Sequence, residues 1–98
     1  MNIEQQKSND SLTLFLSGRL DTVTAPQLEE HLNANLDGVS SLVLDFSELN
    51  YISSAALRVL LTAQKRMNRQ GSMVVRHVND VIAEVFEITG FCDILTVE

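Results

Sequence analysis

The sequence contains little of what covalent cross-links, metal centres and flexible linkers require. Its 98 residues include one cysteine, Cys92, so no internal disulfide can form, and a zinc site would need histidines as distant as His31 and His77. One proline and four glycines are too few for a disordered chain or a long linker. Since 45% of the residues are hydrophobic, we expect residues 1–98 to form one globular domain.

We expect no segment that directs or anchors the protein to a membrane. Residues 1–7 lack the apolar core of a signal peptide, and no apolar run approaches the ~20 residues of a membrane helix. We therefore expect a cytoplasmic protein with no membrane partner. The net charge of -6 disfavours direct binding to nucleic acid, because phosphates repel an acidic domain, and it favours a basic protein partner.

Hydrophobic periodicity in the first third of the chain predicts two strands and a helix. Residues 11–20 alternate in hydrophobicity as a half-buried strand does, and residues 3–7 are expected to add an edge strand. A helix should begin near Thr24, which fits a capping box with Gln27. Gly38 can terminate this helix.

The middle of the chain predicts a central strand and a long helix. Residues 42–44 form a short, continuous apolar run, which is typical of a strand buried on both faces. Asp45 stands at the expected C-terminal end of that strand, and residues 47–53 are expected to form a polar turn. An apolar stripe then predicts a helix over residues 54–70.

The last third of the chain adds a strand, a helix and a short final strand. Residues 73–77 are expected to be a strand. Asn79 can cap the next helix and Gly90 can end it. Residues 94–97 are expected to form a short last strand. Helical crossovers between strands require parallel pairing. The sequence therefore predicts an α/β fold, with a mixed, largely parallel sheet of four to five strands and three to four helices packed on it.

Motifs of the common enzyme classes are absent. The sequence has no phosphate-binding loop, dinucleotide fingerprint, HExxH, CxxC or GxSxG element. The adjacent Glu29 and Glu30 fit a solvated helix face better than an acid/base pair. Asp45 stands where response-regulator receivers carry a phosphorylated aspartate, but the chain offers no acidic pair for Mg²⁺ and is short for that fold. We therefore expect neither an enzyme nor a bound cofactor.

Ser53 and Ser54 stand where the central strand and its turn lead into the long helix. A helix N-terminus has free backbone amides and a partial positive charge. A serine there can cap the helix, and serine is a preferred cap residue. Its hydroxyl can also carry a phosphate that the amides hold. Both interpretations fit the pattern.

Three segments, in this order and spacing, carry a resemblance to a known family. Gly18–Asp21 followed by Thr24-Ala25 is similar to the pattern Gly-x-Leu-Asp-x-x-Thr-Ala. Residues 42–47 resemble the strand before that family's switch, and residues 51–57 resemble an aromatic or aliphatic pair followed by Asp-Ser-[Ser/Thr]-Gly-Leu. On these segments the whole chain, residues 1–98, is similar to the bacterial anti-sigma factor antagonists, which are single STAS domains.

The resemblance implies a function, a mechanism and a site. Ser54 falls on the family's phosphorylated serine, and Asp21 falls on a loop aspartate near the partner surface. The unphosphorylated domain is expected to be a monomer that binds an anti-sigma factor serine kinase and frees a sigma factor. Phosphorylation of Ser54 would end binding, and a serine phosphatase would reset the switch. The residues expected to contact the partner are Asp21, Thr22, Thr24, Ser53, Ser54 and Arg58.

The chain departs from the family pattern beside the phosphorylated serine, and this keeps other functions open. Ser53 replaces an aspartate, Ala55 replaces a hydroxyl residue, and Ala56 replaces a glycine. One alternative is a constitutive docking subunit of a lipid-transport or stress-signalling complex that is not phosphorylated. Another is an enzyme with Ser54 as its nucleophile, although the sequence places no histidine beside it as a base.

Overall fold

Five strands form one sheet in the order in which they occur along the chain, and only the first pair is antiparallel. The computed structural model describes all residues, 1–98. The strands are β1 (Asn2–Ser8), β2 (Ser11–Leu20), β3 (Ser41–Ile52), β4 (Ser72–Arg76) and β5 (Thr96–Val97). The expected edge strand near residues 3–7 is thus present as β1, and the predicted mixed, largely parallel sheet is confirmed.

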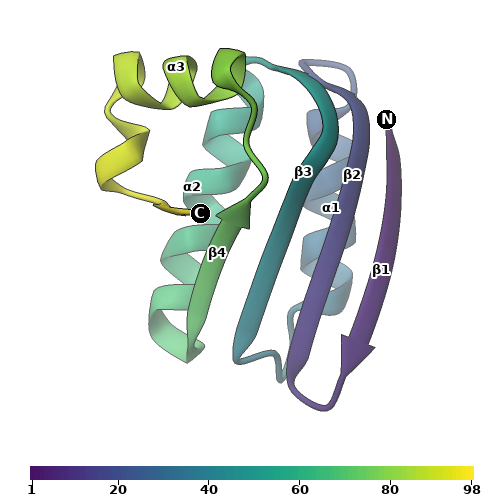
Figure 1. The fold of residues 1–98 in the computed structure, drawn as a ribbon. Coiled ribbons are helices and arrows are strands. Elements are labelled where there is room, and N and C mark those ends of the chain that lie inside the picture. Colours follow the sequence, from purple (N-terminus) through teal and green to yellow (C-terminus); the bar gives the residue numbers. More distant parts are fainter.

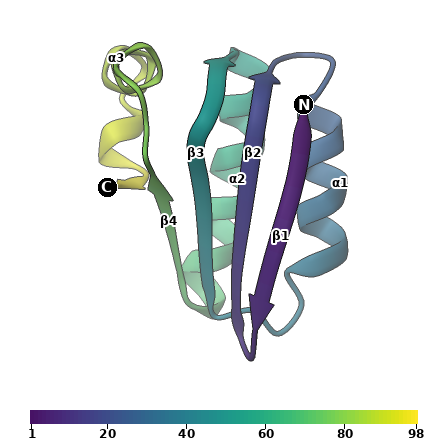
Figure 2. The same cartoon turned by 45° about the vertical axis from the view of Figure 1, so that its right-hand side comes forward.

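Helices cover only one face of this sheet. They are α1 (Ala25–Asn35), α2 (Ser54–Gln70), α3 (Asp80–Thr89) and a short 3₁₀ helix, η1 (Phe91–Asp93). Helices α1 and α2 lie side by side behind the sheet, whereas α3 lies beyond the C-terminal end of β4 (Figures 1 and 2). None of these helices is long and apolar enough to cross a membrane. The connections into α1 and α2 both leave the sheet at the edge where β2 and β3 end (Figure 1).

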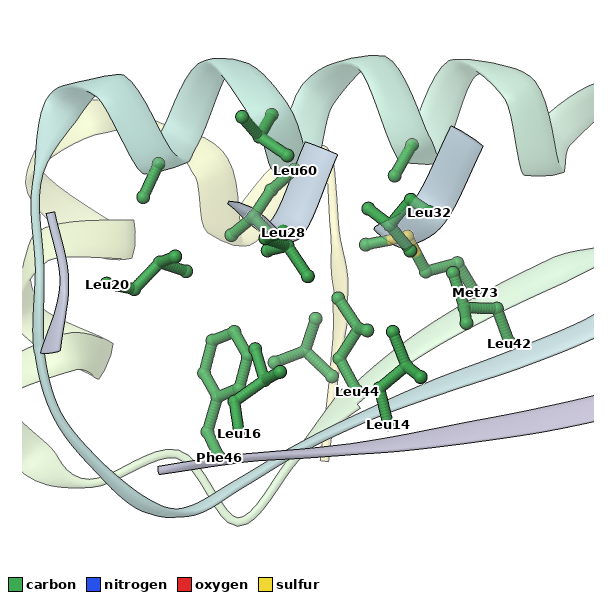
Figure 3. Close-up of a cluster of buried hydrophobic side chains, with 14 of the residues drawn as sticks. Leu14, Leu16, Leu20, Leu28, Leu32, Leu42, Leu44, Phe46, Leu60 and Met73 are labelled. Carbon is green, nitrogen blue, oxygen red and sulfur yellow. The ribbon is translucent and has the colours of Figure 1, made fainter. Parts of the chain in front are cut away.

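The core fills the space between the sheet and the two covering helices. Leucines of β2 and β3 meet leucines of α1 and α2 there (Figure 3). Leu14, Leu44 and Leu60 are each 0% exposed, and burying a leucine side chain contributes about 1.5–3 kcal/mol. This packing holds α1 and α2 against β2 and β3.

Strand β3 is much longer than the sequence pattern predicts. The prediction of a short strand ending at Asp45, with a polar turn over residues 47–53, is wrong because β3 continues to Ile52 beside the second half of β2. Two irregularities in the β2–β3 register each place an extra residue in β3. They change the spacing of buried residues from two, as in Leu44 and Phe46, to three, as in Leu49 and Ile52. The resulting pattern does not alternate.

Two element ends differ from the predictions, whereas α2 ends at Gln70 before Gly71 as predicted. Helix α1 ends at Asn35, because the fully buried Leu36 turns the chain into the core before Gly38 is reached. The last strand is confined to Thr96–Val97, because the amides of Ile94 and Leu95 both donate to the carbonyl of Phe91, the first residue of η1. Gly71 ends α2 without a left-handed backbone, and its hydrogen is needed because an added Cβ would overlap the carbonyl of Ser40.

Candidate functional site

The β2–α1 loop and the start of α2 are brought together by strand pairing. Leu20 and Ile52, the last residues of β2 and β3, are partners in the parallel register. The amide of Ser53 continues this ladder and donates to the carbonyl oxygen of Leu20 across 2.9 Å. Asp21 and Ser53 therefore follow two neighbouring strand ends at one edge of the sheet (Figure 1). We call the six residues predicted from the sequence the Ser54 surface: Asp21, Thr22, Thr24, Ser53, Ser54 and Arg58.

Asp21 organises the loop before α1. Its Oδ1 accepts hydrogen bonds from the amides of Val23, at 3.0 Å, and Thr24, at 3.1 Å. Its own amide donates to Oγ1 of Thr24 at 2.8 Å. The hydrogen bond from the Thr24 amide is the largest of the interactions that lower the pKa of Asp21, and burial opposes them. Asp21 is consequently an ionised carboxylate in a rigid turn at neutral pH.

Thr24 precedes α1 as expected, but the predicted capping box is wrong. Thr24 Oγ1 donates to the carbonyl of Arg19 at 2.8 Å, and it makes no capping bond to the helix. The side chain of Gln27 reaches the carbonyl of Met1, 3.3 Å away, instead of the Thr24 amide. Thr24 is therefore committed to holding the loop, with Asp21 as its partner.

Ser53 and Ser54 have different environments at the start of α2. Ser53 occupies the N-cap position, but its hydroxyl is buried, makes no capping bond and has no hydrogen-bond partner. Ser54 is the first helical residue, and its side chain is exposed. The amides of Ser54, Ala55 and Ala56 donate to no acceptor in the protein. Of the two serines, Ser54 presents its hydroxyl to solvent beside free amides.

The two remaining residues of the Ser54 surface, Thr22 and Arg58, are exposed. Thr22 is part of the loop that Asp21 organises. Arg58 follows Ser54 by one turn of α2, and residues at that spacing share a helix face. Its guanidinium forms no ion pair within the protein. Arg58 is thus free to interact with a charged group on Ser54 or on a partner.

Arg19 and Tyr51 form a neighbouring pair that was not among the residues predicted from the sequence. They are partners in the β2–β3 register, and the Arg19 guanidinium carbon lies 4.2 Å from the centre of the Tyr51 ring. Arg19 Nε also lies 3.6 Å from Oδ2 of Asp21. Only the strand register could have identified this pair, and the bulges of β3 hide that register from the sequence. The pair adds a cation and an exposed aromatic ring beside Asp21.

Asp45, which stands in the sequence where receivers carry a phosphorylated aspartate, is held by hydrogen bonds within the fold. Burial raises the pKa of its carboxyl, but hydrogen bonds from Ser47, Arg76 and His77 outweigh burial and lower the pKa to about 2. Its Oδ2 lies 3.2 Å from Arg76 Nε and 3.1 Å from His77 Nδ1. These bonds join β3 to the end of β4. Asp45 lies seven residues before Ile52, the last residue of β3, and is therefore separate from the Ser54 surface.

The two histidines lie in separate places. His31 Nε2 is 2.8 Å from Oε1 of Gln5, whereas His77 contacts Asp45. No group of three or more histidine, cysteine, aspartate or glutamate side chains is arranged to hold a metal ion. The molecule has three surface depressions, and Ser54 lines none of them. Ser54 lies on an open part of the surface, where a large partner can contact it.

The fold is a small α/β domain with a mixed five-stranded sheet covered on one face, and an exposed serine stands at the first position of α2. The model of the STAS domain family matches residues 1–98. The chain belongs to this family.

Similar proteins agree with this assignment. The chain is 39% identical over 99 residues to BtrV of Bordetella bronchiseptica, named as a candidate anti-sigma factor antagonist, covering 99% of this chain and 85% of that protein. It is 32% identical over 104 residues to the anti-sigma-B factor antagonist of Listeria monocytogenes, covering 100% of this chain and 90% of that one. The structure of the Bacillus cell fate determinant SpoIIAA in its phosphorylated form superposes with a TM-score of 0.77, at 14% identity, covering 99% of this chain and 91% of SpoIIAA.

Proposed function

We propose that this protein is a cytoplasmic anti-sigma factor antagonist whose binding is switched by phosphorylation of Ser54. In the unphosphorylated state it binds an anti-sigma factor that is also a serine kinase, and a sigma factor is released. The observation that carries the proposal is the exposed Ser54 hydroxyl at the first position of α2, beside three amides with no acceptor in the protein.

The names of the relatives and the chemistry of the site both support this proposal. BtrV and the Listeria monocytogenes protein are named for anti-sigma factor antagonism, and SpoIIAA has a phosphorylated form. An anion at a helix N-terminus is stabilised by the free amides and by the helix dipole. A phosphate on Ser54 therefore need not unfold α2.

The phosphate would act on the partner surface. Phosphorylation adds about -1.5 to -2 charge at neutral pH. The added charge and volume stand one helical turn before Arg58 and directly after Ser53, whose amide is bonded to the end of β2, so a partner fitted to the serine hydroxyl would lose its contact there. A loss of about 2.7 kcal/mol weakens binding about a hundredfold. This is a binding role, in which the chemistry belongs to the kinase and to a serine phosphatase.

Phosphate transfer in vitro tests the modification. The purified protein is incubated with its anti-sigma factor kinase and ATP, and the phosphate is mapped by intact mass and fragmentation. We expect one phosphate on Ser54, full modification of Ser53→Ala and none of Ser54→Ala. The Ser53→Ala variant is the matched control because the Ser53 hydroxyl is buried. A protein that remains unmodified would contradict the switch and favour the constitutive docking subunit.

A further inference from the structure

Val23 is a large hydrophobic side chain placed in solvent beside the Ser54 surface. It is 85% exposed, more than any other exposed large hydrophobic residue of the chain. It lies between Thr22 and Thr24, in the loop that follows the end of β2. We propose that Val23 is the apolar anchor through which this protein docks into a pocket of its anti-sigma factor kinase, an inference that rests on the proposed function.

The backbone that carries Val23 is held in place before any partner binds. The amides of Val23 and Thr24 both donate to Oδ1 of Asp21, and Thr24 Oγ1 donates to the carbonyl of Arg19. The amide of Ala25 donates to the Asp21 carbonyl at 2.8 Å. A β-branched side chain is also stiff at χ1. Docking therefore orders few degrees of freedom, and the cost in conformational entropy is low.

The fold does not require an apolar side chain at this position. The amide of residue 23 makes the hydrogen bond to Asp21, and any non-proline residue supplies that amide. The side chain is not part of the hydrophobic core, and turns favour small or polar residues over valine. Isolated hydrophobic residues are common on protein surfaces, so exposure alone does not identify Val23 as a docking residue. Its position supports that role, because the Leu20–Ile52 register places its loop beside the start of α2.

Polar and charged side chains border the loop that carries Val23. Protein–protein interfaces commonly have an apolar centre surrounded by a polar rim. Asp21 supplies a carboxylate, and the Arg19–Tyr51 pair supplies a cation on an aromatic ring. The complementary surface is an apolar pocket, bordered by charged groups, beside the phosphoryl-transfer site of the kinase.

Affinity measurements with matched variants test this inference. The unphosphorylated protein is titrated with its anti-sigma factor kinase by calorimetry, as wild type, Val23→Ala, Val23→Ile and Ile88→Ala. Ile88 is 76% exposed, in α3 on the other side of α2 from the β2–α1 loop (Figures 1 and 2). We expect Val23→Ala to bind about tenfold more weakly, because two carbons leave the pocket. Ile88→Ala should bind within about twofold of wild type, and Val23→Ile, which keeps an apolar β-branched side chain, should bind more tightly than Val23→Ala.

The outcomes distinguish a failure of the Val23 anchor from a failure of the proposed function. All variants should unfold at the wild-type temperature, because Val23 and Ile88 are not core residues. If the wild type binds and Val23→Ala binds equally well, or Ile88→Ala is weakened as much, the anchor is overturned and the proposed function stands. If the wild type itself does not bind the kinase, the proposed function fails and the anchor fails with it.

Discussion

The backbone amide of Ser53 donates a hydrogen bond to the carbonyl oxygen of Leu20 across 2.9 Å. This bond extends the β2–β3 ladder beyond the last strand residues and ties the start of α2 to the end of β2. The loop that begins at Asp21 and the helix that begins at Ser54 are therefore parts of one rigid edge. A partner that binds the β2–α1 loop can therefore also contact the start of α2.

Replacement of Asp21 should separate its role in the loop from its charge. Asp21→Ala removes the acceptor for the amides of Val23 and Thr24, so we expect looser packing of the loop and at least tenfold weaker binding to the anti-sigma factor. Asp21→Asn retains that acceptor and loses the charge. Amide hydrogen exchange of residues 22–25 should rise in Asp21→Ala and stay near wild type in Asp21→Asn. Equal exchange in both variants would contradict the role of Oδ1.

Arg58 should be detectable through the phosphate itself. A phosphoserine has a second pKa near 6, and a nearby cation lowers it. We expect the ³¹P titration of phosphorylated Ser54 to move to higher pH in Arg58→Ala. Arg69→Ala, at the opposite end of α2, is the matched control and should leave the titration unchanged. A midpoint that is the same in both variants would show that Arg58 does not pair with the phosphate.

Asp45 should stabilise the fold only while it is ionised. Its pKa falls from 3.8 to about 2 on folding, so its contribution is complete above pH 4 and is lost as the pH falls toward 2. We expect Asp45→Asn to lower the free energy of unfolding by about 1–3 kcal/mol at pH 6, and by less at pH 3. Asp37→Asn, which breaks an exposed pair with Arg66, should cost less than about 0.5 kcal/mol. Urea unfolding measures all three proteins, and a pH-independent cost of Asp45→Asn would contradict the ion pairing.

Ala56 should be a stabilising departure from the family pattern. It is 0% exposed in the first turn of α2, where the pattern has glycine. We expect Ala56→Gly to lower the free energy of unfolding by about 1 kcal/mol, because glycine loses more backbone entropy in a helix. The phosphorylation of Ser54 should still occur in this variant. An increase in stability would instead reveal strain around the Ala56 methyl group.

The fold class could be predicted from the sequence because the hydrophobic pattern within most segments indicates whether they form a strand or a helix. The alternation in residues 11–20 and the apolar stripe of residues 54–70 each reflect one element packed on one core face. The second half of β3 could not be predicted in this way. Its two bulges remove the alternation, and only pairing with β2 makes it a strand.

The candidate site was predicted only where a local motif marked it. Asp21, Thr24 and Ser54 stand in short patterns shared with the family, and their adjacency follows from the Leu20–Ile52 register. Arg19 and Val23 stand at variable positions of these patterns, and Tyr51 belongs to the pair before the serines, so no pattern marks any of the three as a site residue. Arg19 and Tyr51 meet through strand register, and Val23 is distinguished by its exposure together with its place beside the start of α2 in the folded protein.

The affinity of one anti-sigma factor for two forms of this protein tests the central claim most directly. The unphosphorylated protein and the protein phosphorylated at Ser54 are titrated with the same anti-sigma factor under the same conditions. We predict at least a hundredfold weaker binding of the phosphorylated form, with both forms folded and of similar thermal stability. Equal affinity of the two forms would contradict the phosphorylation switch at Ser54.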